Sequence, residues 1–104
     1  MNRLVGVWER QGLDELRQVK VFTASHFFWV VHDRQTGATL AAGGGTYCLD
    51  GAALTERYEY SSVPQLIGLE VTLTVVFEGN DTWTQTGTAP LPGISLEETY
   101  QRVE

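Results

Sequence analysis

Gly6-Val7-Trp8 near the start of the chain and Arg102 near its end are the residues that decide the fold. The tripeptide opens a strand-like run, and Arg102 lies within the last such run, residues 94–103. In a closed barrel the first and last strands pair, so a guanidinium group on one can lie over an indole face on the other. These two ends therefore predict a closed β-barrel in which Arg102 packs on Trp8.

Extended segments fill the chain between those ends. Thr, Val, Tyr, Phe and Trp are plentiful, and turn signals recur at intervals of roughly ten residues, which is typical of antiparallel all-β proteins. The runs between turns predict eight strands, at residues 4–10, 18–24, 26–32, 39–48, 53–60, 70–78, 82–88 and 94–103. Eight strands suffice to close an up-and-down barrel with a filled or narrowly hollow interior. We therefore predict one β-barrel domain over residues 1–104.

Three segments interrupt this pattern. Residues 11–18 are the only helical candidate, because Leu13 and Leu16 are three apart and acidic residues would lie in the first turn. The glycines at residues 43–45 indicate either a bulge that bends the sheet toward closure or an irregular loop. Residues 61–68 form the longest connection, and we expect them to make the rim of one barrel mouth.

The composition disfavours several classes of partner. The formal charge is −6 at pH 7 and the pI is about 4.8, whereas nucleic acids and anionic membranes need a positive surface. No apolar stretch approaches membrane-spanning length, and no secretion signal follows Met1. Cys48 is the only cysteine, and we expect it to be a buried, inert thiol in a reducing compartment. We therefore expect a cytoplasmic protein without nucleic-acid or membrane partners.

Alternation along the strands suggests which polar residues face the interior. Glu56, Tyr58 and Tyr60 share one side of their strand, and the two tyrosines favour that side as the inner one. Inside a narrow barrel, Glu56 would contact a ligand or transfer a proton, or else belong to a hydrogen-bonded core network. Glu98 faces inward by the same argument, where it either contacts a ligand or pairs with Arg102.

Aromatic residues supply the walls of a possible cavity. An apolar stripe in residues 70–78 makes Phe77 an inner residue, and on the next strand Trp83 and Gln85 share one side. Trp29 lies on a strand that is apolar on both faces, so alternation does not tell which side looks inward. A strand of this kind needs cover on its outer face as well, which suggests a homodimer contact there.

The two histidines do not suggest a metal site. His26 and His32 are six positions apart in one predicted strand, which places them about 20 Å apart at roughly 3.3 Å per residue. No Cys/His spacing motif, phosphate-binding glycine loop or dinucleotide fingerprint is present, so we expect no metal and no cofactor. His26 is either a general base near neutral pH or a structural residue at a strand start.

Several short motifs, together spanning almost the whole chain, resemble those of one protein group. These are Thr23-Ala24-Ser25-His26-Phe27-Phe28-Trp29-Val30, Gly44-Gly45-Thr46-Tyr47, Thr55-Glu56, Glu59-Tyr60, Asp81-Thr82-Trp83 and Leu96-Glu97-Glu98. They resemble small bacterial lipocalin-like domains of unassigned activity, and the Gly6-Val7-Trp8 and Arg102 pairing resembles the signature of the wider calycin group. The resemblance implies a compact calycin barrel and, at most, a capacity for a small ligand, because a fold does not specify chemistry.

Three functional hypotheses follow. The first is binding of a small hydrophobic or aromatic ligand in the lumen, with contacts from Trp29, Tyr58, Tyr60, Phe77, Trp83, Gln85 and Glu98. The second is a cofactor-free enzyme of specialised metabolism, such as an isomerase, cyclase or lyase, in which His26 or Glu56 moves a proton. The third is a structural dimerisation module, which would have a packed interior and no pocket.

Overall fold

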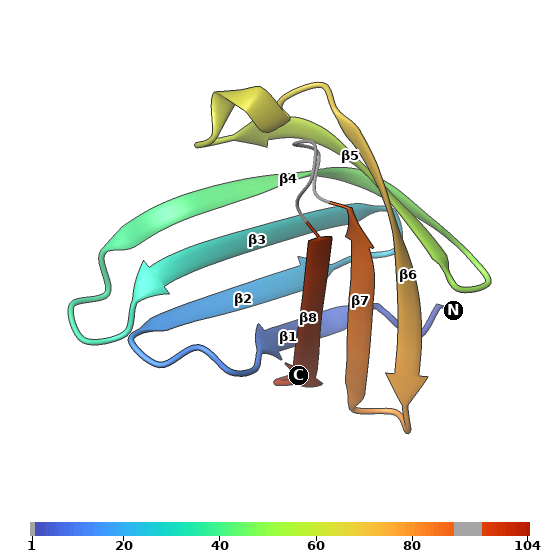
Figure 1. The fold of residues 1–104 in the computed structure, drawn as a ribbon, viewed down its shortest axis with the longest axis horizontal. Coiled ribbons are helices and arrows are strands. Elements are labelled where there is room, and N and C mark those ends of the chain that lie inside the picture. The colour runs from blue at the N-terminus through green and yellow to red at the C-terminus, as the bar shows by residue number, and fades with distance from the viewer. Residues whose placement is uncertain (1, 89–94) are drawn as a thin grey trace.

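The chain forms a closed antiparallel barrel of eight strands in a computed structural model that describes residues 2–88 and 95–104 (Figure 1). The strands are β1 (Gly6–Arg10), β2 (Leu16–Phe22), β3 (His26–Asp33), β4 (Thr39–Asp50), β5 (Ala53–Ser61), β6 (Glu70–Glu78), β7 (Thr82–Thr88) and β8 (Ser95–Arg102). Each strand pairs with the next, and β1 pairs with β8. The predicted all-β, up-and-down barrel is confirmed.

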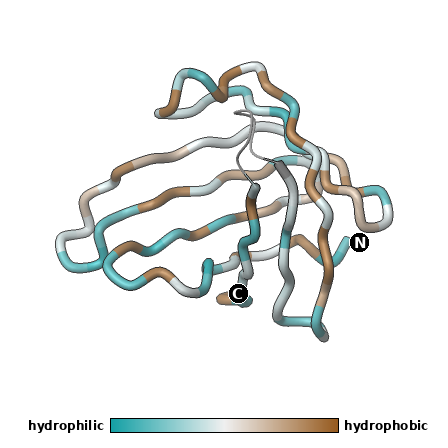
Figure 2. Tube along the Cα trace, in the orientation of Figure 1, coloured by the Kyte–Doolittle hydropathy of each residue, from teal (hydrophilic) through white to brown (hydrophobic). Residues whose placement is uncertain are grey.

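The strand boundaries follow the turn signals closely. Every described strand end lies within two residues of the predicted position, and β6 and β7 match at both ends. Ile94, which the sequence placed at the start of the last strand, lies outside the described residues. Figure 2 shows hydrophilic residues at the turn between β3 and β4 and at the turn between β6 and β7. Turn chemistry therefore fixes where most strands stop.

The predicted helix at residues 11–18 is wrong. Its last residues open β2, where Leu16 pairs with Asp33 and Gln18 pairs with Val31 of β3. A helix of this length is marginal on its own, whereas pairing with β3 supplies a continuous hydrogen-bonded ladder. Within the described parts of the chain the only helix is one 3₁₀ turn, η1 (Pro64–Leu66), which lies in the segment predicted as a rim. No helix there is long and apolar enough to cross a bilayer.

The two ends of the chain meet as the sequence predicts. Trp8 pairs with Arg102 across the seam between β1 and β8, and the guanidinium carbon lies 4.2 Å from the centre of the indole ring. Trp8 is fully buried, and its Nε1 donates to the Leu4 carbonyl at 2.7 Å. Arg102 pairs with Asp81 at 3.2 Å, and Glu98 pairs with Arg10, so the alternative of an ion pair between Glu98 and Arg102 is wrong. The arginine instead covers the end of the core.

Replacing Arg102 with alanine should therefore destabilise the barrel. We expect a loss of about 1–2 kcal/mol, because the variant uncovers the Trp8 face and loses several hydrogen bonds to backbone carbonyls. Urea unfolding measures this loss. Arg57→Ala is the matched control, since Arg57 is exposed and should change stability by less than about 0.5 kcal/mol. Equal losses in the two variants would contradict the role assigned to the seam.

A β-bulge lies at the glycine run. The register between β4 and β5 shifts between Gly44 and Gly45, which confirms the bulge and excludes the loop alternative. A Cβ on Gly45 would collide with the Arg57 carbonyl, so only glycine permits this close approach. The shift also reverses the alternation on β5. Tyr60 is 50% exposed for this reason, and its predicted place on the inner face is wrong.

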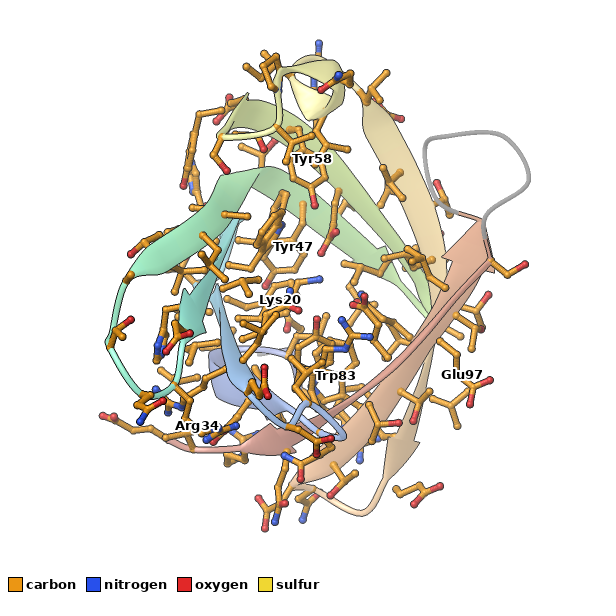
Figure 3. All side chains as sticks on the ribbon, turned by 60° about the vertical axis from the view of Figure 1, so that its left-hand side comes forward. Lys20, Arg34, Tyr47, Tyr58, Trp83 and Glu97 are labelled. Atoms are coloured by element: carbon orange, nitrogen blue, oxygen red, sulfur yellow. The ribbon has the colours of Figure 1, made fainter. Side chains whose placement is uncertain are left out.

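An aromatic cluster fills one end of the barrel. Trp83 stacks on Tyr100 with ring centres 4.7 Å apart, and it meets Trp8 and Phe22 edge-on at 5.7 and 6.0 Å. Trp83 and Tyr100 are completely buried. Figure 3 shows Trp83 of β7 inside the ring of strands and Glu97 of β8 outside it. This packed end leaves the remaining part of the lumen open for a site.

Candidate functional site

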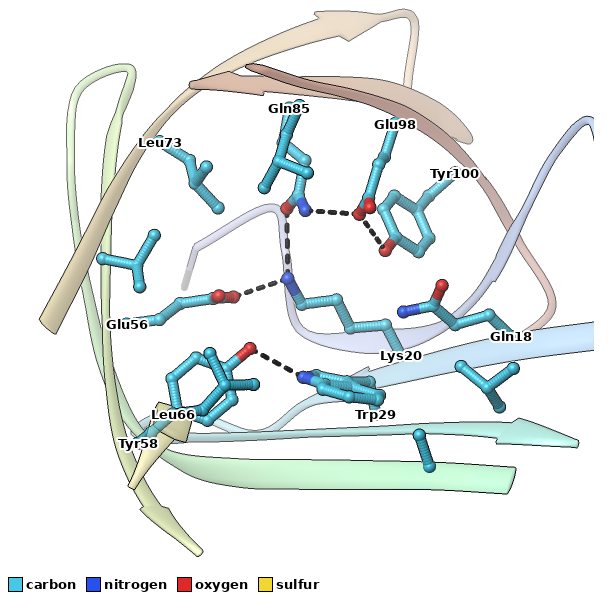
Figure 4. Close-up of a pocket in the computed structure, with 14 residues that line it drawn as sticks. Gln18, Lys20, Trp29, Glu56, Tyr58, Leu66, Leu73, Gln85, Glu98 and Tyr100 are labelled. Carbon is cyan, nitrogen blue, oxygen red and sulfur yellow. Dashed lines mark hydrogen bonds and ion pairs between the residues drawn. The ribbon is translucent and has the colours of Figure 1, made fainter. Parts of the chain in front are cut away.

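A cavity of about 360 Å³ lies in the lumen beyond the aromatic cluster (Figure 4). Its size is within the range of small-molecule pockets. Residues from seven strands and η1 line it, and they are Gln18, Lys20, Trp29, Val31, Ala41, Glu56, Tyr58, Leu66, Val71, Leu73, Gln85, Leu96, Glu98 and Tyr100. A fully packed interior, which the dimerisation hypothesis predicted, is therefore wrong. Leu66 brings η1 into the wall, as expected for a rim segment.

Lys20 occupies the middle of this cavity. Its side chain extends from β2 across the lumen, and the residue is only 2% exposed (Figure 4). The ammonium Nζ lies 2.5 Å from Glu56 Oε2 of β5 and donates to Gln85 Oε1 of β7 at 3.0 Å. Apart from Lys20, no group in the described residues donates to the Glu56 carboxylate. The site therefore centres on a buried ammonium–carboxylate pair.

A hydrogen-bonded chain extends the site toward β8. Gln85 Nε2 donates to Glu98 Oε1 at 2.8 Å, and the Tyr100 hydroxyl donates to the same oxygen at 2.9 Å. Because lysine only donates and a carboxylate only accepts, these contacts fix the orientation of the Gln85 amide. Arg10 lies 3.3 Å from Glu98 Oε2, so Glu56 and Glu98 each have their own cation.

Four aromatic rings also lie near the Lys20 ammonium. The ring centres of Phe22, Phe27, Tyr100 and Trp83 lie 5.2, 5.8, 5.7 and 5.9 Å from Nζ. Each ring presents the negative potential of its π face within the range of a cation–π contact. A positive charge at this position is therefore stabilised by the barrel interior as well as by Glu56.

Tyr58 and Trp29 form the opposite wall. Trp29 Nε1 donates to the Tyr58 hydroxyl oxygen at 2.8 Å, and no described residue accepts the proton of that hydroxyl. Burial, followed by the charge of Glu56, raises the pKa of Tyr58 well above its ordinary value. The hydroxyl therefore stays protonated. The cavity thus offers a hydrogen-bond donor at Tyr58 beside an under-used acceptor at Glu56.

The same physics predicts a loss of stability at high pH. Burial and the charge of Glu98 raise the pKa of Tyr100 as well, so both Tyr58 and Tyr100 keep their protons in the fold. Unfolded tyrosines ionise near pH 10, so the folding free energy is fully present below that pH and declines above it. We expect urea unfolding to show less stability at about pH 11 than at about pH 9.

Tyr100→Phe tests the source of that decline. The variant removes one raised pKa, so its stability should fall less steeply between the same two pH values, although it starts lower because it loses the bond to Glu98. Tyr58→Phe should flatten the decline in the same way, because it removes the other raised pKa. If stability fell equally steeply in the wild type and in both variants, the decline would not come from these two tyrosines.

The structure brings together five of the predicted ligand and proton-transfer residues. These are Trp29, Glu56, Tyr58, Gln85 and Glu98. Phe77 and Trp83 face inward as predicted but belong to the aromatic end and do not line the cavity. Alternation gives the side of a strand on which a residue lies, but it does not give the depth along the barrel at which that residue sits.

The remaining candidates lie outside the cavity. Tyr60 is on the outer face, and His26 is exposed at the start of β3, where Ser25 Oγ lies 2.8 Å from its Nδ1. Cys48 is exposed, so its predicted burial is wrong, because its strand continues to Asp50 and its side chain points outward. Across residues 2–88 and 95–104, no three His, Cys, Asp or Glu side chains gather in a group that would hold a metal ion.

Sequence reasoning missed Lys20, the central residue of the site. On β2 the alternation places Val19 and Val21 on one side and Gln18 and Lys20 on the other, and apolar residues normally face inward. In the barrel the polar side is the buried one. One signal in the sequence pointed to the correct side. Phe22 lies two residues after Lys20, so both share one side of β2, and a large aromatic residue such as Phe22 favours the inner side.

Comparison with known proteins adds no assignment. No protein-family profile matches this chain. No curated protein matches it either.

Proposed function

We propose that this barrel binds one small organic ligand, hydrophobic or aromatic with a single polar group, in its lumen. The observation that carries the proposal is the cavity of about 360 Å³ with a buried polar cluster inside it. Its walls come from apolar residues of β3, β6 and β8 together with Leu66. Such a combination of apolar walls with a few convergent polar groups is typical of ligand sites.

The charges in the cavity favour an uncharged ligand. Glu56 is paired with Lys20, and Glu98 is paired with Arg10, so the described lining residues leave no excess charge for an ionic ligand to neutralise. The Tyr58 proton and the second oxygen of Glu56 remain available for hydrogen bonds. A carbonyl or hydroxyl group on an aromatic ring system would match both of them.

Native mass spectrometry of the freshly purified protein, followed by denaturing extraction, tests the proposal. We expect a defined small molecule on each subunit, or stoichiometric uptake of naphthylmethanol as a probe. Ala41→Trp should abolish uptake because Ala41 lines the cavity and an indole there would fill it. Ala53→Trp is the matched control, since Ala53 is exposed at the start of β5. Uptake that is equal in both variants would place binding outside the lumen.

Proton transfer by Glu56 is the second candidate function. The specific observation in its favour is a carboxylate inside the cavity whose only described donor is Lys20. His26 gains no such support, because it lies on the outer face. An isomerase or lyase of this kind would show a pH–rate profile that Glu56→Gln abolishes and His26→Ala leaves unchanged. A binding protein would show no turnover with the extracted compound.

A further inference from the structure

Lys20 is the only lysine in the sequence, and every other basic side chain except the two histidines is an arginine. Arginine does not lose its proton in proteins, whereas a lysine amine does so when an acceptor is at hand. Lys20, which lines the cavity, is therefore the only side chain of the sequence that joins a long, flexible stem to an amine able to lose its proton. A lysine that served only to add surface charge would be exposed, whereas Lys20 is buried.

A buried ion pair is also a poor means of stabilising a barrel. Removing an ammonium and a carboxylate from water costs several kcal/mol for each ion, and apolar residues of similar volume are often as stable or more so. The neighbours of the pair include Leu73 and Val71, and such residues fill the rest of the inner face of β6. Packing alone therefore does not account for a lysine and an acid at this point.

We infer that Lys20 forms a reversible imine with an aldehyde or ketone ligand held in the lumen. The inference rests on the proposed function, since the carbonyl compound must first occupy the cavity. Three groups needed for this chemistry line the cavity. They are the Lys20 amine, the Glu56 carboxylate 2.5 Å from it, and the Tyr58 hydroxyl, whose proton no described residue accepts. Figure 4 shows these three residues converging on the centre of the cavity.

The step balances without a further reactant. Glu56 takes a proton from the Lys20 ammonium, the free amine adds to the carbonyl carbon, and the Tyr58 hydroxyl donates a hydrogen bond to the developing oxyanion. One proton passes from the new ammonium nitrogen to the oxyanion, which gives a neutral carbinolamine. Glu56 then returns its proton to the carbinolamine hydroxyl group, that oxygen leaves as water, and a protonated imine remains beside the Glu56 carboxylate. The positive charge stays where the ammonium stood, among the four aromatic rings.

Reductive trapping tests the inference on the intact protein. The protein is incubated with naphthaldehyde and sodium cyanoborohydride at neutral pH, and peptide mapping by mass spectrometry locates the alkylated amines. The α-amino group of the purified chain is the internal reference. In water, α-amines ionise near 7.7–8.0 and lysine amines near 10.4, so at pH 7 the α-amine has the larger free fraction by a factor of roughly a few hundred. We nevertheless expect more adduct on Lys20 than on the α-amine.

Two variants and one probe separate the possible causes. Lys20→Arg keeps the charge but forms no imine, so its adduct should be confined to the α-amine. At saturating naphthaldehyde, Glu56→Gln should slow trapping at Lys20 at least about tenfold, because an amide does not accept the proton. Naphthylmethanol resembles the aldehyde but has no carbonyl group, so its binding reports the cavity alone.

The outcomes distinguish this inference from the proposed function. Adduct on Lys20 in excess of the α-amine, lost in Lys20→Arg, supports both. Binding of naphthylmethanol with adduct only on the α-amine overturns the imine and leaves the binding proposal standing. Failure of naphthylmethanol to bind, together with adduct only on the α-amine, overturns both.

Discussion

Lys20→Met should cost the barrel about 3–5 kcal/mol of folding free energy at neutral pH. The variant leaves the Glu56 carboxylate, which is 2% exposed, without the ammonium that lies 2.5 Å from it. It also leaves the buried Gln85 Oε1 without its donor. Urea unfolding followed by tryptophan fluorescence measures the loss.

The double variant Lys20→Met with Glu56→Leu gives the sharper result. Replacing both members of a buried ion pair with apolar residues is often neutral or stabilising, so we expect most of the lost stability to return. Arg57→Met is the control, because it removes an exposed positive charge and should change stability by less than about 0.5 kcal/mol. A double variant as unstable as the single one would show that the pair itself holds the barrel together.

Trp83→Ala should cause a loss of similar size, about 3–5 kcal/mol. Trp83 is fully buried, stacks on Tyr100 and meets Trp8 and Phe22 edge-on, so its removal opens a void at the packed end of the barrel. Trp83 does not line the cavity. We therefore expect the folded fraction of the variant to bind naphthylmethanol with little change in Kd.

Two comparisons make this prediction specific. Val76→Ala alters a side chain of β6 that is 57% exposed, and it should cost less than about 0.5 kcal/mol. Trp29→Ala removes a wall of the cavity, so it should weaken naphthylmethanol binding more than Trp83→Ala does. If Trp83→Ala weakened binding more than Trp29→Ala, the division of the lumen into a packed end and a binding end would be wrong.

The architecture was accessible from the sequence because its signals are local. Asp50-Gly51 and Gly79 mark tight turns, and both glycines adopt positive φ, at 59° and 71°. The apolar stripe of β6 and the Trp8–Arg102 pair then identified the inner face of one strand and the closure of the barrel. Each of these signals needs only a few neighbouring residues, or two ends that the fold must join.

The site was less accessible because it depends on contacts between distant strands. Glu56 and Gln85 were placed on the correct faces by alternation, yet their partner Lys20 is 36 and 65 positions away from them. On β2 the polar side faces the interior, whereas apolar residues normally do. The polar partners of Lys20 come from β5 and β7, and only the closed barrel brings those strands to face β2. Tyr60 was misplaced because a bulge reverses alternation without changing composition.

The most direct test of the ligand-binding lumen is a titration of the protein with naphthylmethanol, followed through the indole N–H resonances of its three tryptophans. Trp29 faces the cavity and donates to Tyr58, whereas Trp8 donates to the Leu4 carbonyl under the Arg102 seam. The account predicts a saturable shift of the Trp29 resonance while the Trp8 resonance stays in place. A Trp29 resonance that does not move up to the solubility limit of the probe would contradict it.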